Sequence, residues 1–379
     1  MAVLSKARDA MRESNSMARL LTLPAEQRSV VVYAEDTFSY IQLKGYLNAL
    51  WNEHGIPHQY VTSDPEDPLL SDSPVGADVW FIRDQLARFI SRLECDVFVT
   101  TMPDLGRFHV PLPKRGRTVY VFHSLNSTHT AYRRGAFDNY DVFLCTGPHH
   151  VRELSALRSS DPAIFSKTGY YKLDLIREEF EAFTKSSTPS NDLVLVAPSW
   201  GPGNILESVG SEVISSLMRA GLRVIVRPHP QFFHSLYPKG RAVIESLIDE
   251  FERESGVEFE LTIDSQNSFL SSGLMISDWS GAAFEFALGT RRPALFVDTP
   301  QKIFNQDWQS LGISSFERST REVVGEIVSI DDVTGIGERA RKMLAVDSIA
   351  SRLDELAHQL VFNLGQSSSA GASAIAEAL

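Results

Sequence analysis

Apolar and polar residues alternate along the chain in the manner of short buried strands separated by amphipathic helices. Residues 30–34 form a β-branched apolar run, which predicts a buried strand. After it, Leu43, Leu47 and Leu50 recur at helical spacing, and Gly55 provides a helix end. Further strand-like runs, with helical patterns between several of them, follow at residues 59–62, 96–101, 118–122, 141–145 and 165–168. Near-continuous apolar strands joined by helices predict a parallel sheet covered on both faces.

This alternation stops once, at residues 185–191, and then restarts. The segment reads Lys-Ser-Ser-Thr-Pro-Ser-Asn, which is polar and rich in turn formers, so we interpret it as a linker. Beyond it, strands are expected at residues 193–197, 223–226, 257–261, 273–277 and 294–298, with helices at 204–220 and 241–254. Two α/β halves of similar size predict two Rossmann-like lobes with a cleft between them.

These boundaries divide the chain into three parts. We expect an N-terminal lobe over residues 1–187, a nucleotide-binding C-terminal lobe over 188–335, and C-terminal helices with a flexible tail over 336–379. Residues 320–363 are expected to be helical, whereas the small and polar residues 365–373 predict a frayed end.

Composition narrows the classes of function. A length of 379 residues allows two hydrophobic cores, and 43% apolar with 22% charged residues is ordinary for a globular protein. The net charge of −12 argues against general nucleic-acid binding, although it leaves room for a local basic pocket or a basic patch at a membrane. Cys95 and Cys145 lie in apolar runs without metal or redox spacing, and predict buried free thiols in a reducing compartment. Without a secretory signal or a span of about 20 apolar residues, the chain is expected to be soluble and cytoplasmic.

The clearest chemical signal is the turn Asp278-Trp279-Ser280-Gly281, which lies between an apolar run and a helical stretch. A helix N-terminus presents unpaired backbone N–H groups and a partial positive charge, so it can bind a phosphate. Ser280 adds a hydroxyl donor, and Gly281 lets the backbone approach an anion closely. This turn predicts a phosphate site at the end of a strand.

Other strand ends add anion donors and proton carriers. Arg227 and His229 flank Pro228, and an arginine fork with a directed histidine donor suits a leaving diphosphate. His123 ends a strand in the first half and could take a proton from a hydroxyl, or it could be a capping or core histidine. Glu285 lies one helical turn beyond Gly281, where it could accept hydrogen bonds from ribose hydroxyls or be a solvated helix position.

Several familiar motifs are absent or incomplete. The sequence holds no Walker-type phosphate loop and no zinc-binding helix motif. Gly201-Pro202-Gly203 lacks the third glycine of a dinucleotide fingerprint. His149 and His150 are neighbours, which point in different directions on a helix, so a metal site is not expected there.

Taken in chain order, five segments resemble the motifs of the CDP-glycerol glycerophosphotransferase family, the teichoic-acid polyol-phosphate transferases. The segments span residues 118–300, and the two C-terminal ones are the most specific. They are His123-Ser124-Leu125, Gly169-Tyr170-Tyr171-Lys172-Leu173-Asp174, Ala197-Pro198-Ser199-Trp200, Arg227-Pro228-His229-Pro230 and Asp278-Trp279-Ser280-Gly281.

The resemblance implies a two-lobed GT-B fold and a transfer in surface-polymer synthesis. The donor would be a CDP-polyol such as CDP-glycerol, and the acceptor a hydroxyl of a polymer or lipid-linked chain at the inner face of the membrane. By the same similarity, His123 would be the general base. His229 would be the second catalytic residue and would hold the leaving diphosphate. Donor-binding residues would be Trp200, Arg227, Asp278, Ser280, Gly281 and Glu285. No cofactor is implied, and these residues do not define a metal requirement.

The chain departs from the family pattern at three positions. His123 is followed by Ser-Leu-Asn rather than Gly-Thr-Pro, Gly281 replaces a second serine, and Gly201 replaces a charged residue. Two alternatives therefore stay open. One is another GT-B sugar-nucleotide enzyme, either a glycosyltransferase or a UDP-N-acetylglucosamine 2-epimerase. The other is a nucleotide-binding protein without catalysis.

Overall fold

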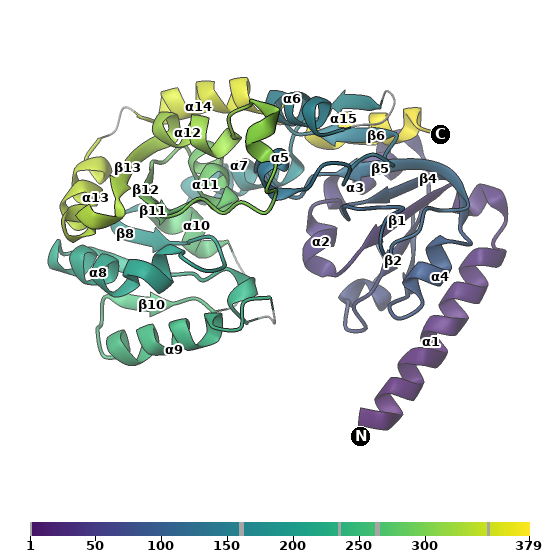
Figure 1. Cartoon of the computed structure of the whole chain (residues 1–379), viewed down its shortest axis with the longest axis horizontal. Helices are drawn as coiled ribbons and strands as arrows, with labels where there is room; N and C mark the ends of the chain where they lie inside the picture. Colours follow the sequence, from purple (N-terminus) through teal and green to yellow (C-terminus); the bar gives the residue numbers. More distant parts are fainter. Residues whose placement is uncertain (1, 159–162, 234–235, 262–265, 347–348) are drawn as a thin grey trace.

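The computed structural model describes residues 2–158, 163–233, 236–261, 266–346 and 349–379. These residues fold into two lobes, each built on one parallel sheet with helices packed against it (Figure 1). The predicted α/β fold with two Rossmann-like lobes is confirmed. Cys95 and Cys145 are buried free thiols, as the sequence predicted.

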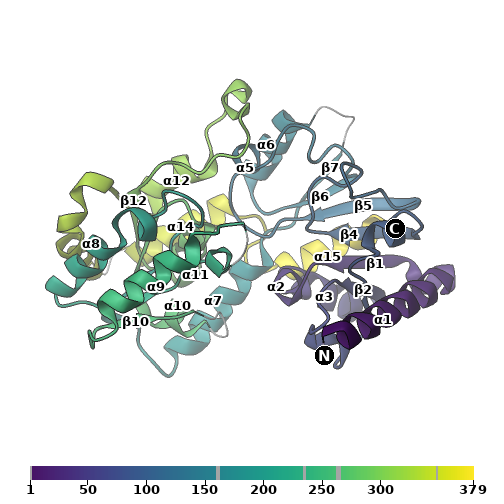
Figure 2. The same ribbon diagram turned by 60° about the horizontal axis from the view of Figure 1, so that its bottom comes forward.

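The N-terminal lobe holds a seven-stranded sheet in the order β3-β2-β1-β4-β5-β6-β7, in which neighbouring strands are parallel. Its strands are β1 (Val30–Ala34), β2 (His58–Thr62), β3 (Ala77–Phe81), β4 (Glu94–Thr100), β5 (Arg115–Val121), β6 (Val142–Cys145) and β7 (Ile164–Lys167). Its helices are α1 (Ala2–Thr22), α2 (Thr37–Ile41), α3 (Lys44–His54), α4 (Leu86–Ile90), α5 (Thr128–Ala131) and α6 (Pro148–Leu157), with short 3-10 helices η1 (Ala25–Arg28) and η2 (Pro68–Leu70). The first helix, α1, extends along the β3 edge and away from the body of the lobe (Figures 1 and 2).

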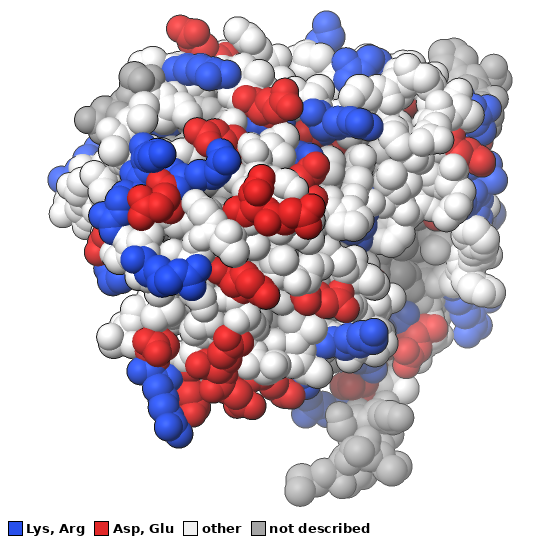
Figure 3. Space-filling view, turned by 60° about the vertical axis from the view of Figure 1, so that its left-hand side comes forward, with Lys and Arg blue, Asp and Glu red and all other residues white. Residues whose placement is uncertain are grey.

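The C-terminal lobe holds a six-stranded parallel sheet in the order β10-β9-β8-β11-β12-β13. Its strands are β8 (Ser190–Val196), β9 (Arg223–Val226), β10 (Val257–Phe259), β11 (Ser272–Ser277), β12 (Ala294–Asp298) and β13 (Gly325–Ser329). Its helices are α8 (Ile205–Arg219), α9 (Gly240–Phe251), α10 (Asn267–Ser271), α11 (Gly281–Thr290), α12 (Phe316–Val324), α13 (Ile336–Leu344) and α14 (Ile349–Leu360), with η3 (Pro230–Phe233), η4 (Trp308–Leu311) and η5 (Ile330–Gly335). The face of this lobe in Figure 3 carries interspersed basic and acidic side chains.

In both sheets the chain order reverses beside the first strand, between β1 and β4 and between β8 and β11. Such a reversal opens a crevice at the carboxyl ends of the strands, because the two flanking connections leave on opposite faces of the sheet. The loops after β8 and β11 therefore lie at the reversal point of the C-terminal sheet. This topology positions the Asp278 turn beside the Trp200 loop.

Two strands were not predicted from the sequence. β3 lies at one edge of the first sheet and has two buried residues. β13 lies at an edge of the second sheet with one buried residue, inside the stretch 320–363 that we expected to be helical. Both are edge strands buried along only part of their length, so neither has a continuous apolar run.

The C-terminus returns to the N-terminal lobe, which corrects the prediction of a frayed tail. Helix α14 packs on α11, and helix α15 (Ser367–Glu377) then crosses to pack on α3 (Figure 1). Ala372 and Ile375 are fully buried in the core of the N-terminal lobe. A β-carbon at Gly371 would lie 2.3 Å from the Tyr46 ring, so the small residues that suggested disorder instead permit close helix packing.

Two segments join the lobes, and Asp174 connects them. Helix α7 (Tyr171–Thr184) leads from the first lobe and packs on α11 of the second. Its Asp174 carboxylate accepts hydrogen bonds from the backbone N–H groups of Gly365 (2.8 Å) and Ser367 (2.9 Å). This carboxylate therefore fixes the start of α15 where the chain returns.

We expect Asp174→Ala to release α15, because it leaves two backbone N–H groups without their acceptor. The expected loss is about 1–3 kcal/mol in the free energy of unfolding, measured by urea denaturation. Amide hydrogen exchange over residues 367–377 should accelerate more than exchange in the central strands. Glu178→Ala is the control, because Glu178 is an exposed carboxylate on the same helix. Equal exchange rates in the two variants would contradict this role for Asp174.

Candidate active site

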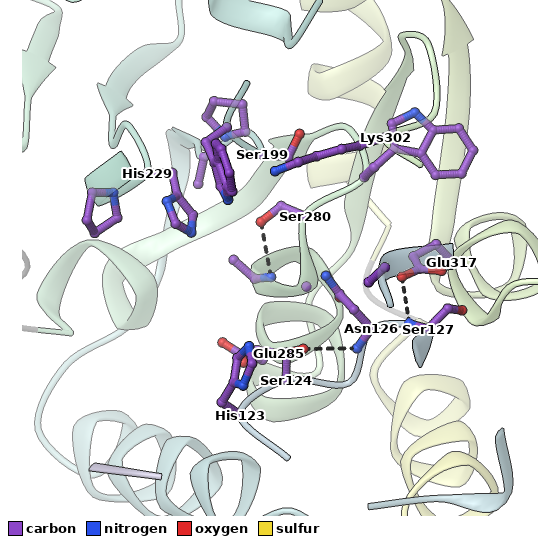
Figure 4. A pocket seen from close by; sticks show the side chains of 18 of the residues that line it. His123, Ser124, Asn126, Ser127, Ser199, His229, Ser280, Glu285, Lys302 and Glu317 are labelled. Carbon is purple, nitrogen blue, oxygen red and sulfur yellow. Dashed lines mark hydrogen bonds between the residues drawn. The ribbon is translucent and has the colours of Figure 1, made fainter. Parts of the chain in front are cut away.

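Loops at the carboxyl ends of both sheets meet at one cleft of about 500 Å³ between the lobes. Seven of the eight predicted site residues line it, and Figure 4 shows side chains from both lobes around one space. The lining includes His123, Ser124 and Asn126 after β5, Ser199 and Trp200 after β8, Arg227 and His229 after β9, and Ser280, Gly281, Glu285 and Lys302 around α11 and after β12. The eighth residue, Asp278, does not reach the cleft.

Asp278 is fully buried behind the cleft wall, which corrects its predicted contact with the donor phosphates. Its carboxylate accepts hydrogen bonds from three backbone N–H groups, those of Ser199 (2.7 Å), Trp279 (2.6 Å) and Ile205 (3.3 Å). A carboxylate held in this way fixes the loop after β8, the start of α8 and its own turn at once. Asp278 is therefore a positioning residue. The sequence suggested that Asp278 contacts the donor because the turn that Asp278 holds in place is itself part of the cleft wall.

Ser280 and Gly281 begin helix α11 at the cleft. The Ser280 hydroxyl oxygen accepts from the backbone N–H of Ala282 (3.3 Å), as an N-cap residue does, and it keeps a hydrogen of its own to donate. A β-carbon on Gly281 would lie 2.5 Å from Oδ1 of Asn126, which reaches across from the N-terminal lobe. The glycine thus permits close approach of the two lobes.

Arg227 and His229 are both held in place by neighbours on the C-terminal lobe. The Arg227 guanidinium donates to the Ser268 hydroxyl (3.2 Å) and lies 3.6 Å from the Glu260 carboxylate. Burial lowers the pKa of Arg227, and the Glu260 charge opposes that shift. Nδ1 of His229 accepts from the backbone N–H of Gln231 (3.2 Å), so a neutral His229 ring carries its proton on Nε2.

His123 follows β5 and faces the cleft between the lobes (Figure 4). Its side chain is accessible along the cleft, but the walls limit its hydration, and desolvation lowers its pKa below the ordinary value of 6.5. The Lys172 ammonium lowers this pKa further, and the Glu285 carboxylate opposes both effects. The imidazole is therefore neutral at pH 7 and available as a base.

Glu285 is buried, which rules out the alternative that it is a solvated helix position. Its Oε1 accepts from the Tyr170 hydroxyl (2.7 Å), and its Oε2 pairs with the Lys172 ammonium (2.7 Å). The Tyr170 hydroxyl also lies 3.0 Å from the carbonyl oxygen of His123. Glu285 thus organises the surroundings of His123, and both of its oxygens already have partners.

Lys302 is a cleft residue that we did not predict. It lies in the loop after β12, and its ammonium sits 3.2 Å from the centre of the Trp200 ring. Burial lowers the pKa of Lys302 to about 7, and the Asp278 charge opposes the shift. The rule that ligands bind beyond strand ends applies to this loop too, but a single lysine in a polar loop carries no motif that distinguishes it.

Asn126 and Glu317 are further cleft residues that sequence reasoning missed, and they belong to contacts between the lobes. The backbone N–H of Ser127 donates to Oε1 of Glu317 (2.8 Å), and the backbone N–H of Phe316 donates to the Ser127 hydroxyl (2.6 Å). The carbonyl of Thr130 accepts from the backbone N–H of Asn305 (3.0 Å). We call the contacts of Ser127 and Thr130 with Asn305, Phe316 and Glu317 the inter-lobe seam.

The described part of the chain contains no cluster of His, Cys, Asp or Glu that could hold a metal ion. The neighbouring His149 and His150 are both buried in the N-terminal lobe. Nδ1 of His150 lies 2.9 Å from the Thr146 hydroxyl, and its Nε2 lies 3.1 Å from the carbonyl oxygen of Asn126. This histidine therefore supports the loop that carries His123.

The fold and the position of the cleft define a two-lobed α/β protein of the GT-B class, and comparison with solved structures confirms this class. The wall teichoic acid polymerase TagF, in a form soaked with CDPG, aligns with a TM-score of 0.60 at 13% identity, over 99% of this chain and 98% of that chain. A Rickettsia africae glycosyltransferase aligns at 0.53 and 13% identity, over 93% and 98% of the two chains. A Listeria monocytogenes protein described as a UDP-N-acetylglucosamine 2-epimerase aligns at 0.56 and 15% identity, over 91% and 94%. No protein-family model and no curated protein sequence matches the chain.

The approach of Asn126 to Gly281 predicts that the two positions are energetically coupled. Gly281→Ala should destabilise the protein by about 1 kcal/mol, because the Asn126 side chain must turn away from the new β-carbon. In an Asn126→Ala background the same change should be neutral or slightly stabilising, since alanine is the better helix former. Denaturation of the four proteins measures the coupling. Equal effects of Gly281→Ala in both backgrounds would show that the contact has no energetic consequence.

Proposed function

We propose that this chain is a transferase that moves a polyol phosphate from a CDP-polyol donor to a hydroxyl acceptor in surface-polymer synthesis. The observation that carries the proposal is the pairing of a neutral histidine with an anion site across one cleft. His123 comes from the N-terminal lobe, while Arg227, His229 and Ser280 come from strand ends of the C-terminal lobe. A base facing a phosphate site is what transfer to a hydroxyl requires.

In the proposed reaction the acceptor hydroxyl attacks the β-phosphorus of the donor. The oxygen–phosphorus bond to the acceptor forms, the bond between the β-phosphorus and the bridging oxygen breaks, and CMP leaves with the bonding pair. The hydroxyl proton passes to the His123 imidazole. The charge that develops on the departing phosphate meets the helix α11 N-terminus, Arg227 and His229. Glu285 and Lys172 keep the surroundings of His123 fixed through this step.

The motif order supports the donor class, and the fold is compatible with it. The order of five motif-like turns along the chain resembles that of the polyol-phosphate transferases. A fold like that of TagF is compatible with the same chemistry. The acceptor would be a polymer or a lipid-linked chain reached by peripheral contact with a membrane. Every helix in the described residues is too short or too polar to cross a bilayer.

A sugar-nucleotide enzyme is the second candidate. The Ser280-Gly281 turn followed by Glu285 favours it, because a glutamate at this place can accept hydrogen bonds from a ribose. The partners that Glu285 already has, Tyr170 and Lys172, weigh against that reading. A nucleotide-binding protein without catalysis is the third candidate, and it would not need a neutral His123.

A donor panel distinguishes these candidates. We expect purified protein with a hydroxyl acceptor, such as glycerol phosphate or a short polyol-phosphate primer, to release CMP from CDP-glycerol or CDP-ribitol. UDP-sugars should give no UDP. Turnover of UDP-sugars with silent CDP-polyols would reject the proposed donor, and binding without any turnover would favour the third candidate.

Variants of the two cleft histidines should separate chemistry from binding. His123→Ala should lower kcat by about 10²–10⁴-fold, the usual contribution of a general base, with the Kd of CDP unchanged. His229→Ala should weaken CDP binding as well, because it removes a donor from the anion site. His358→Ala is the control, since His358 is exposed on α14 outside the cleft. A His123→Ala enzyme with normal kcat would exclude His123 as the base.

The pH profile provides a further test of His123. Its pKa is lowered from 6.5, so the neutral base persists as the pH falls below that value. With saturating donor, kcat should be flat around pH 7 and fall only below about 6.5. The acid limb should be absent from the residual rate of His123→Ala. A limb centred above pH 7 would contradict the environment described for this ring.

A further inference from the structure

Among the described residues that line the cleft, Lys302 is a cation that neither the sequence motifs nor the proposed chemistry uses. Its ammonium lies over the faces of two aromatic rings, 3.2 Å from the centre of Trp200 and 4.9 Å from the centre of Phe304. Figure 4 shows the side chain extending across the cleft toward Ser199, on the side where Ser280 and His229 also lie. Lys302 therefore belongs to the same space as the proposed phosphate site.

The loop that carries Lys302 is fixed from both lobes. The Trp279 indole N–H donates to the carbonyl of Thr299 (2.7 Å), which ties the loop to the α11 turn. The backbone N–H groups of Phe304 and Asn305 both donate to the carbonyl of Thr130 (3.0 Å each), across the inter-lobe seam. Lys302 lies between these anchor points, so its position depends on the approach of the two lobes.

Lys302 differs from the neighbouring cations in its charge environment. Lys172 pairs with Glu285, and Arg227 lies beside Glu260. No carboxylate among the residues that the structure describes forms an ion pair with Lys302, and the charge that acts on it is that of Asp278 behind the wall. An ammonium offers three donors and no acceptor, so an anionic group is its natural ligand.

We propose that Lys302 binds the donor's phosphate directly, opposite His229 and above the N-terminus of α11. This inference rests on the proposed function, since it names a further ligand of the same donor. The aromatic walls exclude water from the ammonium and hold it, which strengthens its interaction with a phosphate oxygen. Trp200, predicted to bind the donor itself, would instead act by supporting Lys302.

Proton uptake on binding follows from the environment of this lysine. With a pKa of about 7, Lys302 is partly neutral in the empty cleft at neutral pH. A bound phosphate favours the charged form and raises the pKa of Lys302, so the lysine takes up a proton from solvent as the donor binds. Affinity should therefore fall as the pH rises above 7. Among the described residues, Asp278 behind the cleft wall supplies the charge that acts on Lys302, and His229 from the loop after β9 is the other titratable group of the proposed phosphate site.

Equilibrium titration with CDP and UDP between pH 7.5 and 9 tests the inference. Lys302→Met keeps the apolar stem against Trp200 and removes the charge, so it should weaken binding of the tighter nucleotide by about tenfold or more. Lys302→Arg should keep binding and lose the decline with pH, because arginine stays charged. Lys342→Met is the control, as Lys342 is exposed on α13 of the same lobe. Cytidine, which has no phosphate, should bind all four proteins equally.

Three other outcomes of these titrations would contradict either the role of Lys302 or the proposed function. Wild-type affinity for CDP and UDP in Lys302→Met would overturn the inference and leave the proposed function standing. A loss of cytidine binding in the same variant would show that Lys302 only shapes the wall. Wild-type protein that binds neither nucleotide would overturn the proposed function itself.

Discussion

The candidate site exists because the inter-lobe seam holds together the loops at the carboxyl ends of two separate sheets. Ser127 contributes a backbone N–H to Glu317 and a hydroxyl to the backbone of Phe316, while the carbonyl of Thr130 accepts from Asn305. These bonds join the loop after β5 to the loop after β12 and the start of α12. The same two loops carry His123 and Lys302, so the seam fixes the distance between the base and the anion site. Residues far apart in the sequence thus become one site through a few buried hydrogen bonds.

Buried carboxylates organise this arrangement from behind. Asp278 gathers three backbone N–H groups of the C-terminal lobe, Asp174 holds the returning C-terminus, and Glu285 binds Tyr170 and Lys172. None of these groups needs a substrate to be satisfied, because each has hydrogen-bond donors around it. A division follows between acidic residues whose carboxylates have hydrogen-bond donors within the protein and basic residues, such as Arg227 and Lys302, that line the cleft. That division is why a chain with a net charge of −12 can still present an anion site.

The sequence predicted the fold well wherever burial was complete. Central strands such as β1 and β11 are buried along their whole length, and their sequences contain continuous apolar runs. The edge strands β3 and β13 are buried in part and lack such runs. Seven of the eight predicted site residues reached one cleft because strand ends in parallel sheets converge. Pairings across the lobes, such as Asn126 with Gly281, depend on how two separate domains dock. No local pattern encodes that docking, so Lys302, Asn126 and Glu317 could not be found from the sequence.

Closure of the cleft and its charge state are linked. Desolvation lowers the pKa of both His123 and Lys302, because a closed cleft without an anion disfavours the charged forms of its bases. Lys172 and Arg227 lie beside carboxylates, and these negative charges reduce the free-energy cost of burying the two cations. The hydrogen bonds of the inter-lobe seam therefore offset the cost of desolvating His123 and Lys302. In the proposed function, a bound phosphate would remove that cost. In the proposed function, a donor anion would supply the counter-charge that Lys302 lacks, whereas a neutral ligand of the same shape would not. The proposed donor would therefore be held by charge as well as by the shape of the cleft.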